Sequence, residues 1–148
     1  MAASAGSLLH ASAVAVGDRA VLLTGPSGSG KSSLAMDMIS RGAVLVADDR
    51  TELRRRGDFV EVSAPVEIAG LIEARGVGIL RLPSIGPVCL ELVVDLGAEE
   101  TARLPERHSE RLLEVEVDAL RGGNVPGLAA VLTAILRFGW CEDAALPP

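Results

Sequence analysis

Short runs of apolar residues, separated by turns that contain Gly and Asp, follow one another along the chain. The first two runs, at residues 8–16 and 20–24, flank Gly17 and Asp18, which favour a tight turn. We therefore expect a β-hairpin whose second strand is buried. Residues 31–41 carry apolar side chains at helical spacing, and this periodicity predicts a helix.

The remaining runs predict more strands and a second helix, and no repeat or linker divides them. Strands are expected at 43–47, 51–56, 59–63, 88–96 and 113–117, and a helix is expected at 128–138. Residues 64–72 predict an irregular connection, Glu73 begins a predicted loop that ends at Gly78, and the polar segment 97–111 is expected to be mobile. The pattern predicts an α/β fold in a single domain that covers residues 1–148.

Charge and aromatic content limit the kinds of partner. The chain has a net charge of −6 and a pI of about 4.9, which disfavours binding to nucleic acid or to an anionic membrane. Phe59, Phe138 and Trp140 are its only Phe, Trp or Tyr residues, so few rings are available for stacking on bases. We expect no nucleic-acid partner and no membrane association. The basic run at residues 54–56 is interpreted either as a solvated strand end or as a docking patch for an acidic partner.

Cysteine usage and hydropathy favour a cytoplasmic location. Cys89 and Cys141 lack the spacing of a metal site or a redox pair, so we interpret them as free thiols in a reducing compartment. The first residues lack the layout of a secretory signal. The longest apolar stretch near the C-terminus, at residues 128–136, is too short to span a bilayer.

A glycine-rich loop follows the buried strand at 20–24 and matches the pattern G-x-x-x-x-G-K-[ST]. Its residues are Gly25, Pro26, Ser27, Gly28, Ser29, Gly30, Lys31 and Ser32. Glycines allow backbone N–H groups to surround phosphate oxygens, and the following helix presents its positive end to the anion. Lys31 is expected to reach the β- and γ-phosphates, and the Ser32 hydroxyl to bind magnesium. The loop therefore predicts nucleoside triphosphate binding, but it does not distinguish a kinase from an ATPase or GTPase.

Asp48 and Asp49 end the strand that follows the first predicted helix, at the sheet edge where ligands bind in open α/β folds. Adjacent strand residues point to opposite faces, so one carboxylate should face the phosphates and the other should be structural. The first would bind magnesium or accept a proton from an attacking hydroxyl. His10 should lie near the loop end of its hairpin neighbour, either orienting these groups or simply packed. Glu73, taken alone, is typical of a solvated residue.

Together these features resemble a known family. His10, the phosphate loop, the sequence RGAVLVADD at residues 41–49 and the sequence EARGVGI at residues 73–79 occur in the order seen in the catalytic domain of HPr kinase/phosphorylase. The resemblance covers roughly residues 8–96 and points to a short form without the family's N-terminal domain. It implies a mixed β-sheet core that contains the phosphate loop, with flanking helices, related to the ATP-binding core of phosphoenolpyruvate carboxykinase.

The resemblance also implies roles for individual residues. Lys31 would contact the transferring phosphate of ATP, and Ser32 and Glu73 would hold Mg²⁺. Asp49 would deprotonate the target serine hydroxyl and protonate the leaving serine in the reverse reaction, with His10 supporting it.

The family's catalytic arginine is expected in the polar segment, where Arg103 is the first candidate and Arg107 the second. The substrate implied is a serine of HPr, the small carrier protein of the sugar phosphotransferase system, and family members form hexamers, so we expect a homo-oligomer.

The chain departs from the family pattern in three ways that bear on function. Pro26 replaces an Asp, Ser33 replaces a Glu, and Pro126-Gly127 is followed by Leu128-Ala129 instead of the Arg and Asn of a stretch linked to the phosphorylase reaction. Two alternatives therefore stay open beside a serine kinase with possible phosphorylase activity. One is a P-loop kinase of small molecules, with the arginine-containing segment 103–111 as its lid. The other is a non-catalytic regulatory protein that senses ATP.

Overall fold

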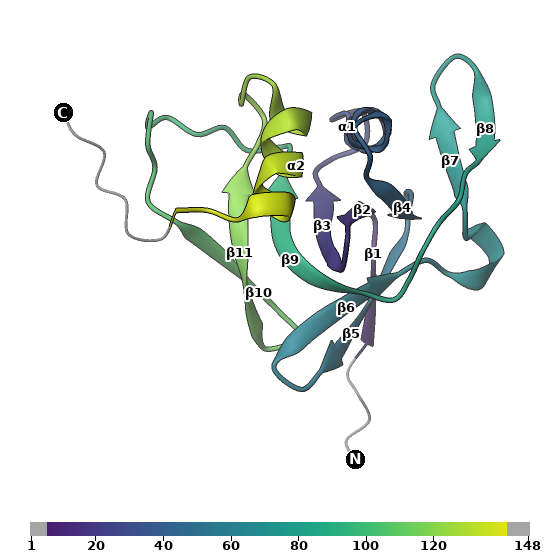
Figure 1. Ribbon diagram of the computed structural model, residues 1–148, viewed down its shortest axis with the longest axis horizontal. Coiled ribbons are helices and arrows are strands. Elements are labelled where there is room, and N and C mark those ends of the chain that lie inside the picture. The colour runs from purple at the N-terminus through teal and green to yellow at the C-terminus, as the bar shows by residue number, and fades with distance from the viewer. Residues whose placement is uncertain (1–5, 142–148) are drawn as a thin grey trace.

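The computed structural model describes residues 6–141, and their main element is one strongly curved mixed sheet of nine strands (Figure 1). Its strands are β1 (Gly6–Leu9), β2 (Ser12–Val16), β3 (Arg19–Thr24), β4 (Val44–Ala47), β5 (Thr51–Arg56), β6 (Phe59–Ser63), β9 (Val88–Asp95), β10 (His108–Leu112) and β11 (Val115–Arg121). They lie in the order β1–β5–β6–β9–β3–β2–β4, with β11 beside β9 and β10 beside β11. This mixed sheet with flanking helices confirms the predicted α/β fold.

Helices α1 (Lys31–Ser40) and α2 (Leu128–Phe138) match the two predicted helices and pack together over β2 and β3 (Figure 1). The cluster beneath them is aliphatic, as expected from a chain with few aromatic residues. Its fully buried members include Val14, Val21, Leu23, Leu92 and Leu132. Burial of this surface fixes α1 against the strand that leads into the glycine-rich loop.

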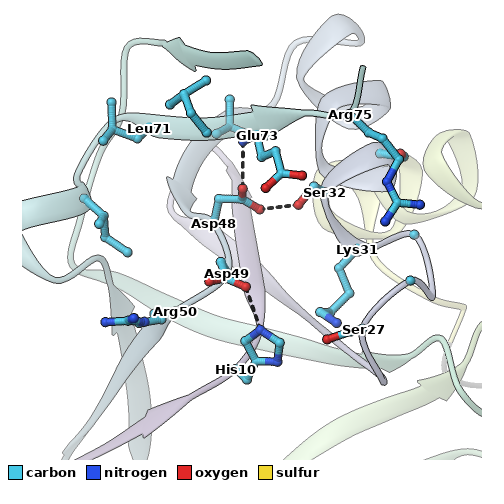
Figure 2. Close-up of a pocket in the computed structure, with 16 residues that line it drawn as sticks. His10, Ser27, Lys31, Ser32, Asp48, Asp49, Arg50, Leu71, Glu73 and Arg75 are labelled. Atoms are coloured by element: carbon cyan, nitrogen blue, oxygen red, sulfur yellow. Dashed lines mark hydrogen bonds and ion pairs between the residues drawn. The ribbon is translucent and has the colours of Figure 1, made fainter. Parts of the chain in front are cut away.

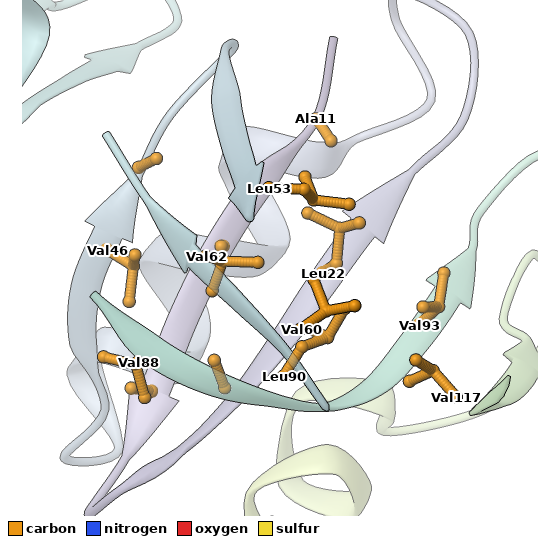
Figure 3. Packing of buried hydrophobic residues seen from close by; sticks show 14 of the residues in the cluster. Ala11, Leu22, Val46, Leu53, Val60, Val62, Val88, Leu90, Val93 and Val117 are labelled. Atoms are coloured by element: carbon orange, nitrogen blue, oxygen red, sulfur yellow. The ribbon is translucent and has the colours of Figure 1, made fainter. Parts of the chain in front are cut away.

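The opposite face of the sheet is covered by the sheet itself. Figure 3 shows side chains of β3, β6, β9 and β11 meeting inside the curve, among them Leu22, Val62, Leu90 and Val117. Because the strands bend around this second cluster, no further helix is required to bury it. The two clusters together hold β3 between packed layers, so the loop at its end has a rigid base.

The hairpin predicted from the first two apolar runs is confirmed, since β2 and β3 pair antiparallel with Val16 opposite Arg19. The prediction of one continuous strand over 8–16 is wrong. The chain divides into β1, which pairs with β5, and β2, which pairs with β3 and β4. The curvature of the sheet requires a bend between the two halves, and residues 8–16 contain no Gly, Pro, Asn or Asp to predict it.

Further corrections concern the second half of the chain. The predicted loop from Glu73 to Gly78 is instead most of a hairpin, formed by β7 (Leu71–Ala74) and β8 (Gly78–Arg81), that stands apart from the main sheet (Figure 1). A short 3₁₀-helix, η1 (Val66–Ile68), precedes it. The strand predicted at 113–117 is wrong in its start and length, because Leu113 and Glu114 have positive φ and form the β10–β11 turn. Strand β10, largely exposed and polar, was not predicted.

Candidate active site

The phosphate loop begins directly after β3, at Gly25, and runs directly into α1, which begins at Lys31. Gly28 and Gly30 have φ of 84° and 97°, values that side chains disfavour, and Gly30 is the N-terminal cap of α1. No side chain caps the helix, and its first turn contains no acidic residue. The N–H groups at this end are therefore directed to the loop, in the arrangement that binds anions.

Lys31 lies inside this loop rather than on the surface. It is the only lysine in the chain, and it is 7% exposed. Its Nζ donates hydrogen bonds to the carbonyls of Gly25 at 2.7 Å and Pro26 at 3.1 Å. The loop backbone thus holds a full positive charge beside the helix N-terminus. Both features favour a polyphosphate at this position.

Asp48 is the centre of the buried hydrogen-bond network next to the loop. Its residue is 5% exposed, and its Oδ1 accepts hydrogen bonds from Ser12 Oγ at 2.8 Å and from Ser32 Oγ at 2.7 Å (Figure 2). Its Oδ2 accepts the backbone N–H of Glu73 at 3.0 Å. One carboxylate therefore connects β2, α1 and β7, and it is the member of the Asp pair that is buried.

Asp49 points the other way and meets His10. The distance between His10 Nε2 and Asp49 Oδ1 is 2.6 Å, and both side chains are more than half exposed (Figure 2). Asp49 has φ of 70°, a left-handed conformation that is unusual for a residue with a side chain. The prediction that the two carboxylates would face different directions agrees with this geometry, and so does the position expected for His10.

A cavity of about 490 Å³ unites these groups. It is lined by three residues of the loop before the helix (Ser27, Gly28 and Gly30), by Lys31, Ser32 and Ser33, and by His10, Asp48, Asp49 and Arg50. Residues of η1 and of the β7–β8 hairpin also line it, including Glu73 on β7 and Arg75 in the hairpin turn. Gly25, Pro26 and Ser29 form the loop without lining the cavity. Arg103 lies exposed between β9 and β10 and does not line it, so its predicted catalytic role stays a prediction.

Three residues of this region were missed as site residues. Arg50 and Arg75 add positive charge to the cavity, and Ser12 contacts both aspartates. Arg75 lies within the sequence EARGVGI that carried the resemblance, so its position was a usable signal. Ser12 is the one polar residue among residues 11–16, but no motif indicated that its hydroxyl contacts the aspartates.

The oxygen groups beside Lys31 fit a magnesium ion shared with a triphosphate. Magnesium usually binds one or two carboxylates and completes its shell with phosphate oxygens and water. Ser32 Oγ and the carboxylates of Asp48 and Glu73 line the same cavity, and Figure 2 shows the Glu73 side chain turned toward Ser32 and Asp48. Over residues 6–141, no group of three or more His, Cys, Asp or Glu side chains is arranged to hold a metal by itself.

Comparison with known proteins gives the family. The sequence model of the HPr Serine kinase C-terminal domain matches residues 2–118, which extends past residue 96, where the resemblance was expected to fade. The chain belongs to this family. It is 40% identical over 112 residues to the HPr kinase/phosphorylase of Alkaliphilus metalliredigens, covering 66% of this chain and 36% of that protein. It is 46% identical over 78 residues to the HPr kinase/phosphorylase of Burkholderia lata, covering 52% and 24%.

The family fold is also evident in three dimensions. The structure of the Hpr(Ser) kinase/phosphatase from Coxiella burnetii matches with a TM-score of 0.76 and 25% identity, over 88% of this chain and 94% of that one. The chain spans only about a third or less of the length of the two curated relatives. In residues 6–141, no helix has the length and apolar character needed to cross a membrane.

Proposed function

We propose that this chain is an ATP- and Mg²⁺-dependent protein kinase that phosphorylates a serine hydroxyl of HPr. What carries the proposal is one arrangement: the carboxylate of Asp49, supported by His10, faces the same cavity as the phosphate loop and Lys31. A triphosphate bound at the helix N-terminus would direct its γ-phosphate toward this carboxylate. The relatives of this chain are named for action on HPr, which supports the choice of substrate.

The chemistry assigned to the residues requires one proton transfer. Asp49 accepts the proton of the serine hydroxyl as the serine oxygen bonds to the γ-phosphorus and the bond to ADP breaks. His10 donates its N–H to Asp49 and holds the carboxylate in place. Lys31 and the loop N–H groups stabilise the charge on the phosphoryl oxygens.

Ser32 and Glu73, with Asp48 behind Ser32, would hold Mg²⁺, which when bound neutralises charge on the phosphates. In the reverse direction, Asp49 would return a proton to the serine oxygen as phosphate attacks phosphoserine and pyrophosphate forms. Pro126-Gly127 is not followed by the Arg and Asn that the family resemblance links to that reaction, so the kinase direction is the primary proposal. A cytoplasmic homo-oligomer, hexameric as the family resemblance implies, is part of the same proposal.

The test uses the whole chain, ATP labelled in its γ-phosphate, Mg²⁺ and purified HPr. We expect transfer to a serine of HPr that Asp49→Asn and Lys31→Ala abolish. Asp37→Asn is the matched control, because Asp37 is an exposed aspartate on α1 whose carboxylate pairs with Arg41 on the same helix and does not line the cavity. Control and Asp49→Asn proteins should bind nucleotide with similar affinity.

The other outcomes separate the alternatives. Tight nucleotide binding without transfer to HPr would favour a non-catalytic sensor of ATP, and transfer to a metabolite would favour a small-molecule kinase. Adding inorganic phosphate to phosphorylated HPr tests the reverse reaction. Rapid release of pyrophosphate would show that the phosphorylase activity does not require the missing Arg and Asn.

A further inference from the structure

Ser12 is a fully buried serine at the start of β2, and its hydroxyl bonds to both members of the aspartate pair. Its Oγ donates to Asp48 Oδ1 at 2.8 Å and accepts the backbone N–H of Asp49 at 3.3 Å. Among the hydrogen bonds of the described part of the chain, this is the one side chain that joins the two aspartates. A buried hydroxyl that both donates and accepts fixes the relative position of its partners.

The hydrogen bond from the Asp49 N–H to Ser12 lies at a residue with an unfavourable backbone conformation. Asp49 has φ of 70°, and the turn is closed on its other side by the Arg50 N–H, which donates to the Asp48 carbonyl at 2.8 Å. An Asp in the left-handed region persists only when its surroundings hold it there. That conformation turns the Asp49 carboxylate out of the network of Asp48 and toward His10.

We propose that Ser12 is a positioning residue that couples the phosphate-side carboxylate, Asp48, to the proton-accepting carboxylate, Asp49. Ser32 and Glu73 orient the Asp48 carboxylate by hydrogen bonds. The Ser12 hydroxyl bonds both this carboxylate and the Asp49 N–H, so it links the orientation of Asp48 to the turn that holds Asp49. This inference rests on the proposed kinase function for the role of Asp49, but the geometric coupling itself can be measured without activity.

A purely structural role for Ser12 has a matched comparison in Thr51. Thr51 is also fully buried at the same bend, and its hydroxyl donates to the Ala11 carbonyl at 2.8 Å without contacting a carboxylate. Thr51→Val removes a buried hydroxyl of the same region and preserves side-chain shape. It therefore reports what the loss of a structural hydrogen bond does here.

The first experiment compares Ser12→Thr with Ser12→Val, which have the same shape and differ in the hydroxyl. We expect kcat for transfer to HPr to be lower in Ser12→Val than in Ser12→Thr by about tenfold or more, a size typical for the loss of an orienting partner. The KM for ATP should stay within about twofold, because the loop is untouched. Equal kcat in the two variants, or an equal loss in Thr51→Val, would overturn the proposal. Ser12→Ala, which adds no volume, is measured alongside and should resemble Ser12→Val.

The second experiment reads the geometry directly. In the whole protein, the ring ¹⁵N resonances of His10 should move in Ser12→Val and Ser12→Ala and stay near the wild type in Ser12→Thr and Thr51→Val, since Asp49 leaves His10 only when the Ser12 hydroxyl is lost. Unchanged His10 resonances in every variant would contradict the coupling. If wild-type protein transfers no phosphate to HPr, the proposed function fails, and the resonances alone decide whether Ser12 positions Asp49.

Discussion

His10 and Asp49 meet at the point where two antiparallel strand pairs separate, with Nε2 of one 2.6 Å from Oδ1 of the other. On one side of this point β2 pairs with β4, with Ala13 opposite Ala47, and on the other side β1 pairs with β5, with Leu9 opposite Thr51. The β1–β5 pair and the β2–β4 pair therefore have the same pairing register on the two sides of the bend. The two side chains are therefore exposed to solvent but anchored at both ends by paired strands.

Replacing His10 should affect catalysis far more than stability. We expect His10→Ala to lower kcat by about tenfold or more, because Asp49 loses the donor that orients it. His10→Gln, which keeps an N–H donor, should restore part of the activity. Since an exposed ion pair contributes at most about 1 kcal/mol, the melting temperature should change little. Activity assays with melting curves check both points, and wild-type kcat in His10→Ala would contradict the assignment.

Replacing Asp48 should lower the stability of the fold. Both carboxylate oxygens of Asp48 accept hydrogen bonds, Oδ1 from two hydroxyls and Oδ2 from the Glu73 N–H. In Asp48→Asn, an NH₂ group replaces one of these oxygens and faces a donor instead of an acceptor. A buried donor left without its acceptor costs about 1–3 kcal/mol, so we expect a loss of that size in the free energy of unfolding. Chemical denaturation measures it, and Asp37→Asn is the exposed control. Unaltered stability would show that water replaces the lost contacts.

Local signals in the sequence were sufficient for the parts of the site that depend on neighbouring residues. The loop at 25–32, the helix after it and the strand before it were predicted because glycine spacing and apolar periodicity are local properties. The same holds for α2 and for the β5–β6 hairpin, whose ends coincide with the predicted ones.

The network around Asp48 could not be predicted in this way. Its partners lie 36, 16 and 25 residues away in sequence and come from three different elements. Sequence spacing assigned one carboxylate to chemistry and one to structure, but it could not show that the structural one also bonds the Ser32 hydroxyl. The position of Glu73 in a strand was likewise hidden, because the glycines of residues 76–78 form its hairpin turn and the start of β8 rather than a long loop.

Glu73 offers a direct test of the magnesium site. We expect Glu73→Gln to weaken Mg²⁺ binding in the presence of ATP by about 10- to 100-fold, since a neutral amide is a poorer ligand than a carboxylate. Its backbone N–H still donates to Asp48, so the fold should be retained. The Mg²⁺ dependence of phosphate transfer measures the effect, with Glu67→Gln in η1 as an exposed control. An unchanged Mg²⁺ requirement would exclude Glu73 as a ligand.

The kcat of phosphate transfer can rank the arginines near the site by their effect on catalysis. Arg75 and Arg50 line the cavity with Lys31, whereas Arg103, predicted as the catalytic arginine, lies on the exposed β9–β10 connection. Because a charge acts most strongly where it contacts the transferring group, we expect Arg75→Ala to lower kcat more than Arg103→Ala. A larger loss in Arg103→Ala would show instead that the connection reaches an active site, in this chain or in another subunit.

That connection is ordered by Glu100, whose carboxylate accepts hydrogen bonds from several partners. His108 Nε2 lies 2.8 Å from its Oε2, and the backbone N–H groups of Thr101 and Ala102 donate to its Oε1. The amide of Asn124 bonds both backbone groups of Glu100. The hydrogen bond from His108, followed by those from the two backbone N–H groups, lowers the pKa of Glu100 below its ordinary value.

A depressed carboxyl pKa makes stability depend on acid in a definite direction. Glu100 stabilises the folded state fully above the ordinary pKa of a glutamate, about 4.3, and this contribution is lost as pH falls through its lower folded pKa. We therefore expect Glu100→Gln to be less stable than wild type at neutral pH and to approach it below about pH 4. Denaturant unfolding across this range measures the difference, with Glu110→Gln on β10 as an exposed control. A difference that does not change with pH would mean that Glu100 acts through packing and not through its charge.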